Sequence, residues 1–205
     1  FIDNPSSNKF NYDSLGSYIT LNYDTLNSIN FPTTGHKFSL GFYFRNDEYD
    51  PLMRSDSDDT SKQITLDYRG AFGFKNHTFV AISSFATVMN DDDFTVHVKE
   101  LGGFLNLSGY QQDALIGGHK AFAALVYQYD LGRTVPGSTE LPIYLGTSIE
   151  AGNIWDVSES VKLDGMIGSG SIYLGTDTSF GPAVLGVGFA SDGEYTAFIS
   201  LGKNW

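Results

Sequence analysis

Residues 63–89, QITLDYRGAFGFKNHTFVAISSFATVM, decide the fold of this chain. In the first half of this stretch every second residue is apolar, and the residues between them include Asp67 and Arg69. A period of two places the apolar side chains on one face of a β-strand and the polar side chains on the other. Residues 76–77 form a short connection, and residues 78–89 continue in extended form. The stretch therefore predicts two long antiparallel strands joined by a tight turn.

The same alternation continues along the rest of the chain, and helical periodicity is absent. Connections of two kinds follow one another: short ones at residues 76–77 and 178–181, and long, acidic ones at residues 47–60 and 90–115. The Asp-Gly pair at residues 192–193 signals a further hairpin turn. We expect one domain, residues 1–205, with strands at residues 14–26, 36–46, 61–74, 78–89, 116–131, 141–155, 165–176, 182–190 and 194–204.

The composition excludes several classes of protein. The chain has 205 residues with 12 Lys and Arg against 24 Asp and Glu, a net charge of −12, so nucleic acid is not an expected partner, because phosphate binding needs a basic surface. The absence of cysteine excludes disulfides, thiolate-bound metals and cysteine nucleophiles. The 16 Phe, 12 Tyr and 2 Trp stand in a chain that is only 41% hydrophobic, which fits apolar residues alternating with polar ones.

A soluble β-sandwich and a membrane β-barrel both fit this alternation. Several expected strands are longer than the usual length of about five to six residues, which suits a tilted bilayer crossing. Aromatic residues lie near strand ends, and short turns alternate with long loops, as in outer-membrane barrels. These features favour an all-β, antiparallel transmembrane β-barrel with eight to ten strands in this chain, in the outer membrane of a Gram-negative bacterium and in contact with its lipid. The aromatic residues near strand ends are Tyr23, Tyr129, Trp155 and Trp205.

The C-terminal strand resembles the terminal signal that the outer-membrane assembly machinery recognises. Residues 195–205 alternate, with Phe198 as the exception, and end on an aromatic residue. We expect this strand to close the barrel weakly, with its free backbone groups available to pair with a client strand. The residues assigned to the closing strand and signal are Tyr195, Ile199, Leu201, Gly202 and Trp205.

Five short motifs, in this order along the chain, resemble those of the Omp85 superfamily, in the form closest to the barrels of patatin-like type Vd proteins. They are YDTL at 23–26, FPTTG at 31–35, LGG followed by LSGY within 101–110, EAGNIW at 150–155 and GTDTSFGP at 175–182. The resemblance implies that the chain corresponds to the C-terminal half of a larger barrel, or closes alone or as a homodimer. It also implies a role in protein translocation or outer-membrane protein assembly, with secreted or outer-membrane proteins as clients. The alternatives are the membrane anchor of a patatin-like phospholipase, and a small passive pore or barrel enzyme.

The resemblance also assigns site residues. The tip of the family's long sixth loop corresponds to Leu107, Ser108, Gly109 and Tyr110, with Ser108 at the position of the family's arginine. Because Ser108 cannot form the family's ion pair with inward acidic residues, we expect those acidic residues to pair with cations of the barrel lumen instead. The expected polar network of the lumen comprises Asp67, Arg69, Lys120, Asp130 and Glu150.

No catalytic, metal or cofactor motif stands out, so an enzyme is not expected. The four histidines lack ligand spacing, and the Gly-x-Ser-x-Gly and His-Glu-x-x-His motifs are absent. The acidic stretches 47–50, 56–59 and 91–93 lack the spacing of an EF-hand and are interpreted as solvated loops. The enzymatic alternative is a barrel hydrolase that uses inward-facing Ser148 or Ser200 with a loop histidine such as His119.

Overall fold

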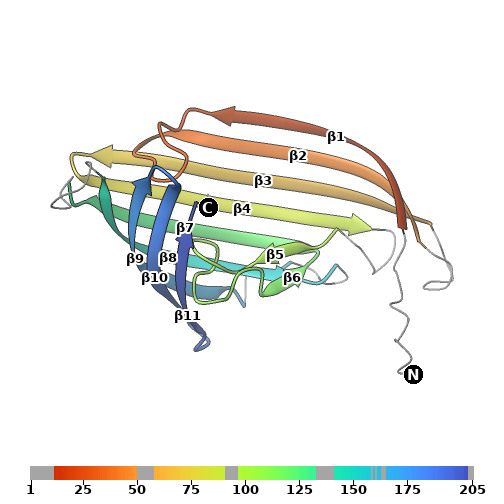
Figure 1. Cartoon of the computed structure of the whole chain (residues 1–205). Helices are drawn as coiled ribbons and strands as arrows, with labels where there is room; N and C mark the ends of the chain where they lie inside the picture. Colours follow the sequence, from red (N-terminus) through yellow and green to blue (C-terminus); the bar gives the residue numbers. More distant parts are fainter. Residues whose placement is uncertain are drawn as a thin grey trace, which may run out of the picture.

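The computed structural model is all-β (Figure 1). It describes residues 12–49, 58–90, 97–132, 141–157, 159, 161–162 and 165–202. Among these residues there is no helix that could span a lipid bilayer. The strands are β1 (Tyr12–Asp24), β2 (Thr34–Tyr49), β3 (Asp58–Phe74), β4 (His77–Asn90), β5 (Lys99–Leu101), β6 (Leu115–Gly117), β7 (His119–Asp130), β8 (Ile143–Trp155), β9 (Ile167–Thr178), β10 (Gly181–Ala190) and β11 (Tyr195–Leu201).

Nine of the strands form one antiparallel sheet in the order β1-β2-β3-β4-β7-β8-β9-β10-β11. Each strand pairs with its sequence neighbour, except that β4 pairs with β7 across the small β5–β6 hairpin. The prediction of nine antiparallel strands is confirmed for this sheet, and most strand ends lie within three residues of the predicted ones. The prediction did not include the β5–β6 hairpin, which lies in a segment expected to be an irregular loop.

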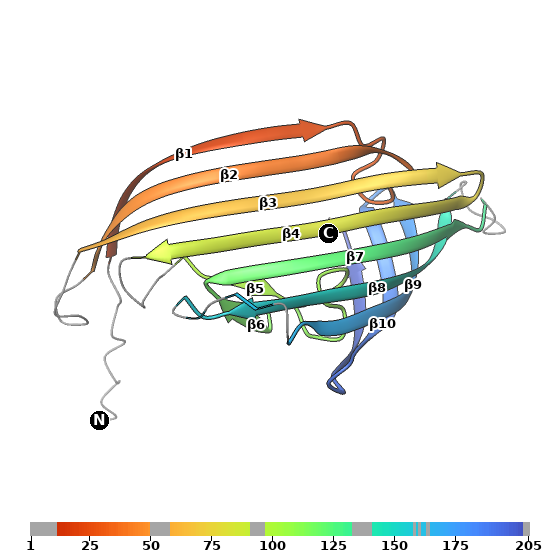
Figure 2. The ribbon, with the colours of Figure 1, turned by 180° about the vertical axis from the view of Figure 1, so that it is seen from behind.

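The sheet curves strongly but does not close into a barrel (Figures 1 and 2). Strands β1 and β11 lie at its two margins, and each pairs on one side only within the described residues. The expected barrel closure is therefore absent from this structure. The nine strands curve around a concave face that other segments fill in part, and none of the described strands joins the two margins.

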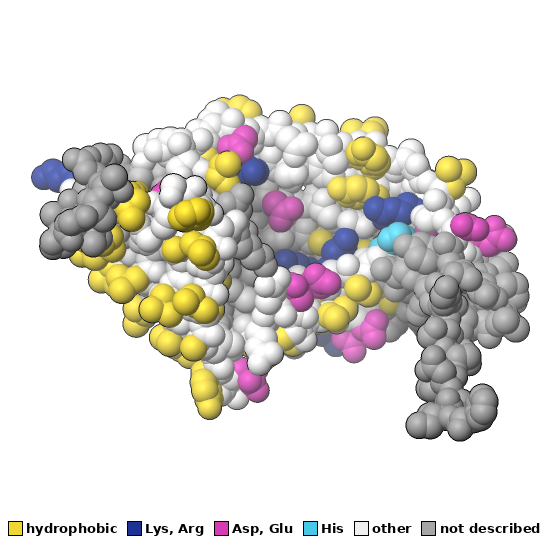
Figure 3. Space-filling view, in the orientation of Figure 1, with side chains coloured by type: hydrophobic (Ala, Val, Ile, Leu, Met, Phe, Trp, Pro, Cys, Tyr) yellow, Lys and Arg dark blue, Asp and Glu magenta, His cyan; other side chains and the backbone are white. Residues whose placement is uncertain are grey.

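The outward face of the sheet is apolar, as the alternation predicted. One row of paired outward positions runs Leu21–Leu40–Leu66–Phe85 across β1 to β4, and another runs Leu145–Leu174–Leu185–Ile199 across β8 to β11. These side chains are not shielded by other parts of the chain: Leu21 is 61% exposed, and Ile199 is 83% exposed. Figure 3 shows hydrophobic side chains along the lower left of the molecule, where β9, β10 and β11 lie.

The concave face is filled on the side of β7 to β11 by two segments that fold back against the sheet. Phe31, from the connection between β1 and β2, is 2% exposed and stacks on Tyr144 with ring centroids 4.6 Å apart. Gly175 makes room for this ring, because a Cβ atom there would lie 2.5 Å from it. The second segment is the loop between β5 and β6, which contributes Leu105 and Leu107 to two buried apolar clusters. The core of this chain thus lies inside the curve of the sheet.

Candidate functional site

The candidate site is the loop of residues 102–114, called here the docked loop, which lies in the concave face of the sheet (Figure 1). Its backbone is tightly folded, with left-handed φ values at Gly102 (128°) and Gly103 (106°) and also at Leu105 (54°) and Leu107 (74°). Left-handed backbone is strained for a leucine, so it persists only where the surroundings hold it. The two buried leucine side chains supply that support, since Leu105 is 6% exposed and Leu107 is 0% exposed.

Ser108, at the tip of the docked loop, joins two distant strands. Its backbone N–H donates to Oε2 of Glu150 at 2.6 Å, and its Oγ donates to Oε1 of the same carboxylate at 2.6 Å. Its carbonyl oxygen accepts a hydrogen bond from Oγ1 of Thr196 on β11 at 2.7 Å. Ser108 is fully buried. The tip therefore connects β8, in the interior of the nine-stranded sheet, to the edge strand β11.

Glu150 is a buried carboxylate that is satisfied by hydroxyl and amide donors. Besides Ser108, its Oε1 accepts a hydrogen bond from Ser148 Oγ at 2.5 Å, and Ser148 Oγ lies 2.7 Å from Ser171 Oγ. A further serine contacts the loop, because Gly109 N–H donates to Ser169 Oγ at 2.9 Å. Burial of a carboxylate is costly unless donors surround it, and here Ser148 of β8 supplies one donor and the loop tip supplies two.

Two glycines permit the close approach of the loop tip to β10. A Cβ atom on Gly188 would lie 1.9 Å from the carbonyl oxygen of Ser108 and 2.4 Å from its carbonyl carbon. A Cβ atom on Gly109 would lie 2.5 Å from the backbone nitrogen of Ala190. Only hydrogen atoms fit at these contacts, so the docked position of the loop depends on both glycines.

Three further contacts fix the sides of the docked loop. Phe104 packs between two inward rings, with centroid distances of 4.8 Å to Tyr173 and 4.7 Å to Phe198. Lys120 Nζ on β7 donates to Asn106 Oδ1 at 3.2 Å. Phe198 is the exception to the alternation of residues 195–205, and its inward contact with Phe104 explains the exception.

The fourth contact is a hydrogen bond between Tyr110 and the turn that joins β10 to β11. The Tyr110 hydroxyl donates to Oδ2 of Asp192. Burial first, and then this hydrogen bond and the charge of Asp192, raise the pKa of Tyr110 to about 12. The same hydrogen bond lowers the pKa of Asp192. Both shifts favour the protonated tyrosine and the ionised aspartate, which is the pair that holds the loop against the turn.

The five residues predicted for the lumen network all lie on the inward series of the sheet, but they do not form one set of contacts. In the described part of the chain no direct ion pair joins any two of Asp67, Arg69, Lys120, Asp130 and Glu150. The expected pairing of the two acidic residues with Lys120 or Arg69 is therefore not seen. Glu150 is occupied by serines, whereas Asp130 lies at the end of β7 and accepts from Gly132 N–H at 2.8 Å.

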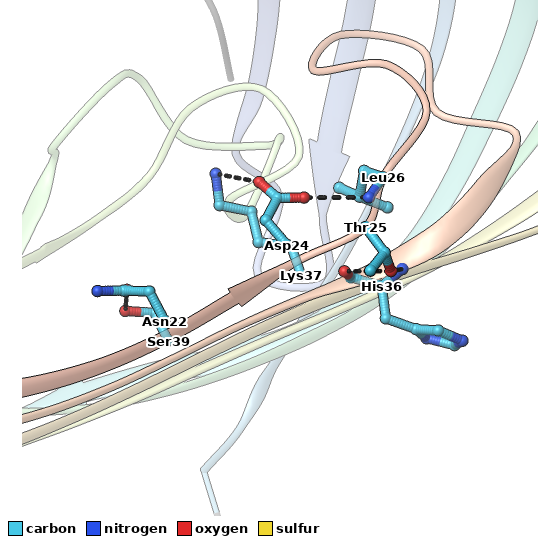
Figure 4. A network of polar contacts seen from close by, with 7 residues as sticks. All are labelled: Asn22, Asp24, Thr25, Leu26, His36, Lys37 and Ser39. Atoms are coloured by element: carbon cyan, nitrogen blue, oxygen red, sulfur yellow. Dashed lines mark hydrogen bonds and ion pairs between the residues drawn. The ribbon is translucent and has the colours of Figure 1, made fainter.

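The remaining three, Asp67, Arg69 and Lys120, line a cavity of about 1120 Å³ between the docked loop, β1 to β4 and β11. Figure 3 shows this hollow with acidic and basic side chains exposed inside it. At its rim Asp24 Oδ2 lies 3.3 Å from Lys37 Nζ, and its Oδ1 accepts from the backbone N–H of Leu26, so that the start of the β1–β2 connection is held in place (Figure 4).

The strand predicted to close the barrel is β11. Tyr195, Ile199 and Leu201 point outward and are at least 66% exposed. Gly202 has a φ of 73° and its N–H donates to the carbonyl of Pro182, so the strand ends there. Trp205 lies outside the described residues.

The groups considered for catalysis and for metal binding lie apart. His119 contacts Thr87 Oγ1 at 2.7 Å and the carbonyl of Val157 at 3.2 Å, whereas Ser148 contacts Glu150 and Ser171. Ser200 lies on the inward series of β11 and lines the cavity. Within the residues that the structure covers, no group of three or more His, Asp or Glu side chains gathers to hold a metal ion. The acidic residues at 50, 56 and 91–93 lie outside the described residues.

A scan against protein-family models and a search of the curated proteins both give no match to this chain.

Proposed function

We propose that this chain forms part of the wall of an outer-membrane β-barrel of the Omp85 type, which assists the passage or insertion of other proteins. The observation that best supports this proposal is the docked loop, whose tip at Ser108 contacts both the middle of the wall and the edge strand β11. A contact of this kind couples the position of the loop to the state of the edge.

The two faces of the sheet support a membrane location. The outward face is a continuous apolar band, and the inward face is polar or covered by the docked loop, which is the distribution of a barrel that faces lipid outside and water inside. A soluble sheet with such a face would need a partner layer to cover it, because exposed apolar patches of this extent are rare on soluble proteins.

The edges of β1 and β11, each unpaired on its outer side within the described residues, support strand addition as the mode of interaction. Edge strands present rows of unpaired N–H and C=O groups, and an extended segment of another protein can pair with them. The second candidate is the membrane anchor of a patatin-like phospholipase, which is favoured by the filled concave face beneath β7 to β11.

A charge placed on the outward face tests the membrane location. Ile149 is 69% exposed and lies on the outward series of β8, so Ile149→Arg should lower the free energy of unfolding in lipid vesicles by about 2–4 kcal/mol. The matched control is Val161→Arg, at a residue of the β8–β9 connection that is 42% exposed, and it should change little. Equal stability of the two variants, or a wild-type chain that does not float with vesicles, would contradict a membrane wall.

Photocrosslinking separates the translocation role from the anchor role. A photoreactive amino acid at Tyr195, on the edge strand, should form adducts with added extended peptides taken from outer-membrane barrel strands. The same probe at Ile149, on a strand paired on both sides, should not. Absence of adducts at both positions in the vesicle-bound protein would favour the anchor.

A further inference from the structure

We propose that His36 and His77 form two binding sites for the phosphate groups of phospholipid headgroups, on the outward face at one end of the sheet. This end, called here the turn end, is the one at which residues 25–33, 75–76 and 179–180 connect neighbouring strands. The inference rests on the proposed membrane location and adds to it a defined ligand chemistry.

The first site is built around a tyrosine that reaches across a glycine. His36 Nδ1 lies 2.9 Å from the hydroxyl of Tyr68 on β3, and the edge of the His36 ring meets Phe72 with centroids 5.4 Å apart. A Cβ atom on Gly70 would lie 2.3 Å from the Tyr68 hydroxyl and 3.0 Å from His36 Nδ1, so the glycine makes this pairing possible. Figure 4 shows the His36 ring on the opposite side of the sheet from Asp24 and Lys37, which face the concave side.

The second site repeats the same chemistry two strands away. His77 Nδ1, at the start of β4, lies 2.7 Å from the hydroxyl of Tyr127 on β7. The ring of Tyr129 lies beside it, with centroids 5.0 Å apart, and Phe79 packs on Tyr127 at 5.3 Å. Both histidines are exposed and belong to the outward series of their strands.

The contact with the tyrosine bears on which histidine nitrogen can act as an outward donor. When the tyrosine hydroxyl donates to Nδ1 of a neutral imidazole, the proton of the ring resides on Nε2. Across the described residues the Nε2 atoms of His36 and His77 make no hydrogen bond with the protein. In that tautomer each site presents an oriented N–H donor whose hydrogen bond a phosphate oxygen can accept.

The charges of the turn end match an anionic ligand. Lys75 lies in the β3–β4 turn, two residues before His77 in the sequence, and its Nζ is 5.3 Å from the ring centroid of Phe74. The described acidic residues nearest this end, Asp24, Asp130 and Asp177, belong to the inward series of their strands. The outward surface here thus carries the two histidines and the cation Lys75 without a described carboxylate.

The position of the two sites along the strands fits the headgroup layer of the bilayer. Tyrosine and other aromatic rings of membrane barrels gather where the hydrocarbon ends and the headgroups begin. His36 and His77 lie within such rings at the margin of the apolar band, so their free Nε2 atoms face the phosphates of the adjacent leaflet.

The direct test is a nitrogen–phosphorus distance measurement on the whole chain in phosphatidylglycerol vesicles. With ¹⁵N-labelled histidine, solid-state NMR should show dephasing of the His36 and His77 Nε2 signals by lipid ³¹P. His97 and His119 serve as internal controls, because their Nε2 atoms are bound to Asp47 and to the Val157 carbonyl. The wild-type protein suffices for this measurement.

A second measurement uses variants and counts retained lipid by native mass spectrometry. His36→Phe with His77→Phe keeps the aromatic belt and removes both donors, so retention of phosphatidylglycerol should fall about tenfold. Tyr23→Phe, which removes a hydroxyl from another outward residue at the turn end, is the matched control and should retain the lipid.

The outcomes separate this inference from the proposed function. Dephasing of the two histidines together with the tenfold loss supports it. A chain that floats with vesicles but shows no dephasing, or equal lipid retention in the double variant, overturns the two phosphate sites and leaves the membrane wall standing. A chain that does not float at all overturns both.

Discussion

Replacement of Gly188 by alanine should expel the tip of the docked loop from the concave face. The new Cβ atom would lie 1.9 Å from the carbonyl oxygen of Ser108, and ordinary contact begins at 3.4 Å. The backbone of the tip must therefore move by about 1.5 Å, because both sides of this contact are main chain or directly attached to it. A shift of this size is enough to break the two 2.6 Å hydrogen bonds from Ser108 to Glu150.

The energetic consequence follows from those two bonds. Each hydrogen bond to a carboxylate contributes about 1.5–3 kcal/mol, so docking should weaken by about 3 kcal/mol or more. In hydrogen exchange this corresponds to roughly hundredfold faster exchange of the Ser108 and Gly109 amides.

The assay is amide hydrogen exchange of residues 102–114 in Gly188→Ala, compared with wild type and with Gly168→Ala. Gly168 lies on the neighbouring strand β9, where a Cβ atom would meet Ser191 at 3.7 Å, an ordinary contact. The control should leave the loop protected. If the Ser108 and Gly109 amides of Gly188→Ala remain as protected as in wild type, the tight contact at Gly188 does not hold the loop.

Further predictions concern the sides of the docked loop. Tyr110→Phe should raise exchange of the loop amides severalfold, and less than Gly188→Ala, since only one hydrogen bond, to the exposed Asp192, is lost. The pKa of Tyr110 is raised, so the stabilisation of the docked loop by this tyrosine is complete below about pH 10 and is lost as the pH rises through about 12. The pKa of Asp192 is lowered, so the stabilisation of the loop by this aspartate is lost as the pH falls through that lowered value. A pH series of loop proteolysis should therefore show protection between these limits, and a flat profile would contradict it. Phe104→Ala should lower the free energy of unfolding by about 3–5 kcal/mol because its contacts with Tyr173 and Phe198 are lost, and urea titration measures this.

Much of the nine-stranded sheet could be predicted, because a half-buried strand leaves a period-two pattern in the sequence. Residues 63–89 predicted a hairpin, and β3 and β4 are joined by a turn at residues 75–76. The outward face was predictable for the same reason. The closed barrel was not confirmed, because alternation reports the two faces of a strand and carries no information about whether the sheet margins meet.

The conformation of the docked loop could be predicted from the sequence only in small part. Its fold depends on left-handed backbone at Leu105 and Leu107, which residue preference disfavours and tertiary packing imposes. The contact of Ser108 with Glu150 joins residues far apart in the chain, and only the resemblance of the loop-tip motif brought the two together as candidates. The inward Phe198 was the one periodicity signal of the loop, since it breaks an otherwise regular strand.

The two margins of the sheet have a consequence for assembly that depends only on the direction in which their strands run. Every neighbouring pair in the nine-stranded sheet is antiparallel, so its first and last strands, β1 and β11, run the same way. Direct pairing of these two margins would create a parallel seam, which an antiparallel barrel does not contain. Any set of strands that closes this sheet into a barrel with antiparallel pairing throughout must therefore be odd in number. The closed barrel then has an even number of strands, as single-chain bacterial barrels have.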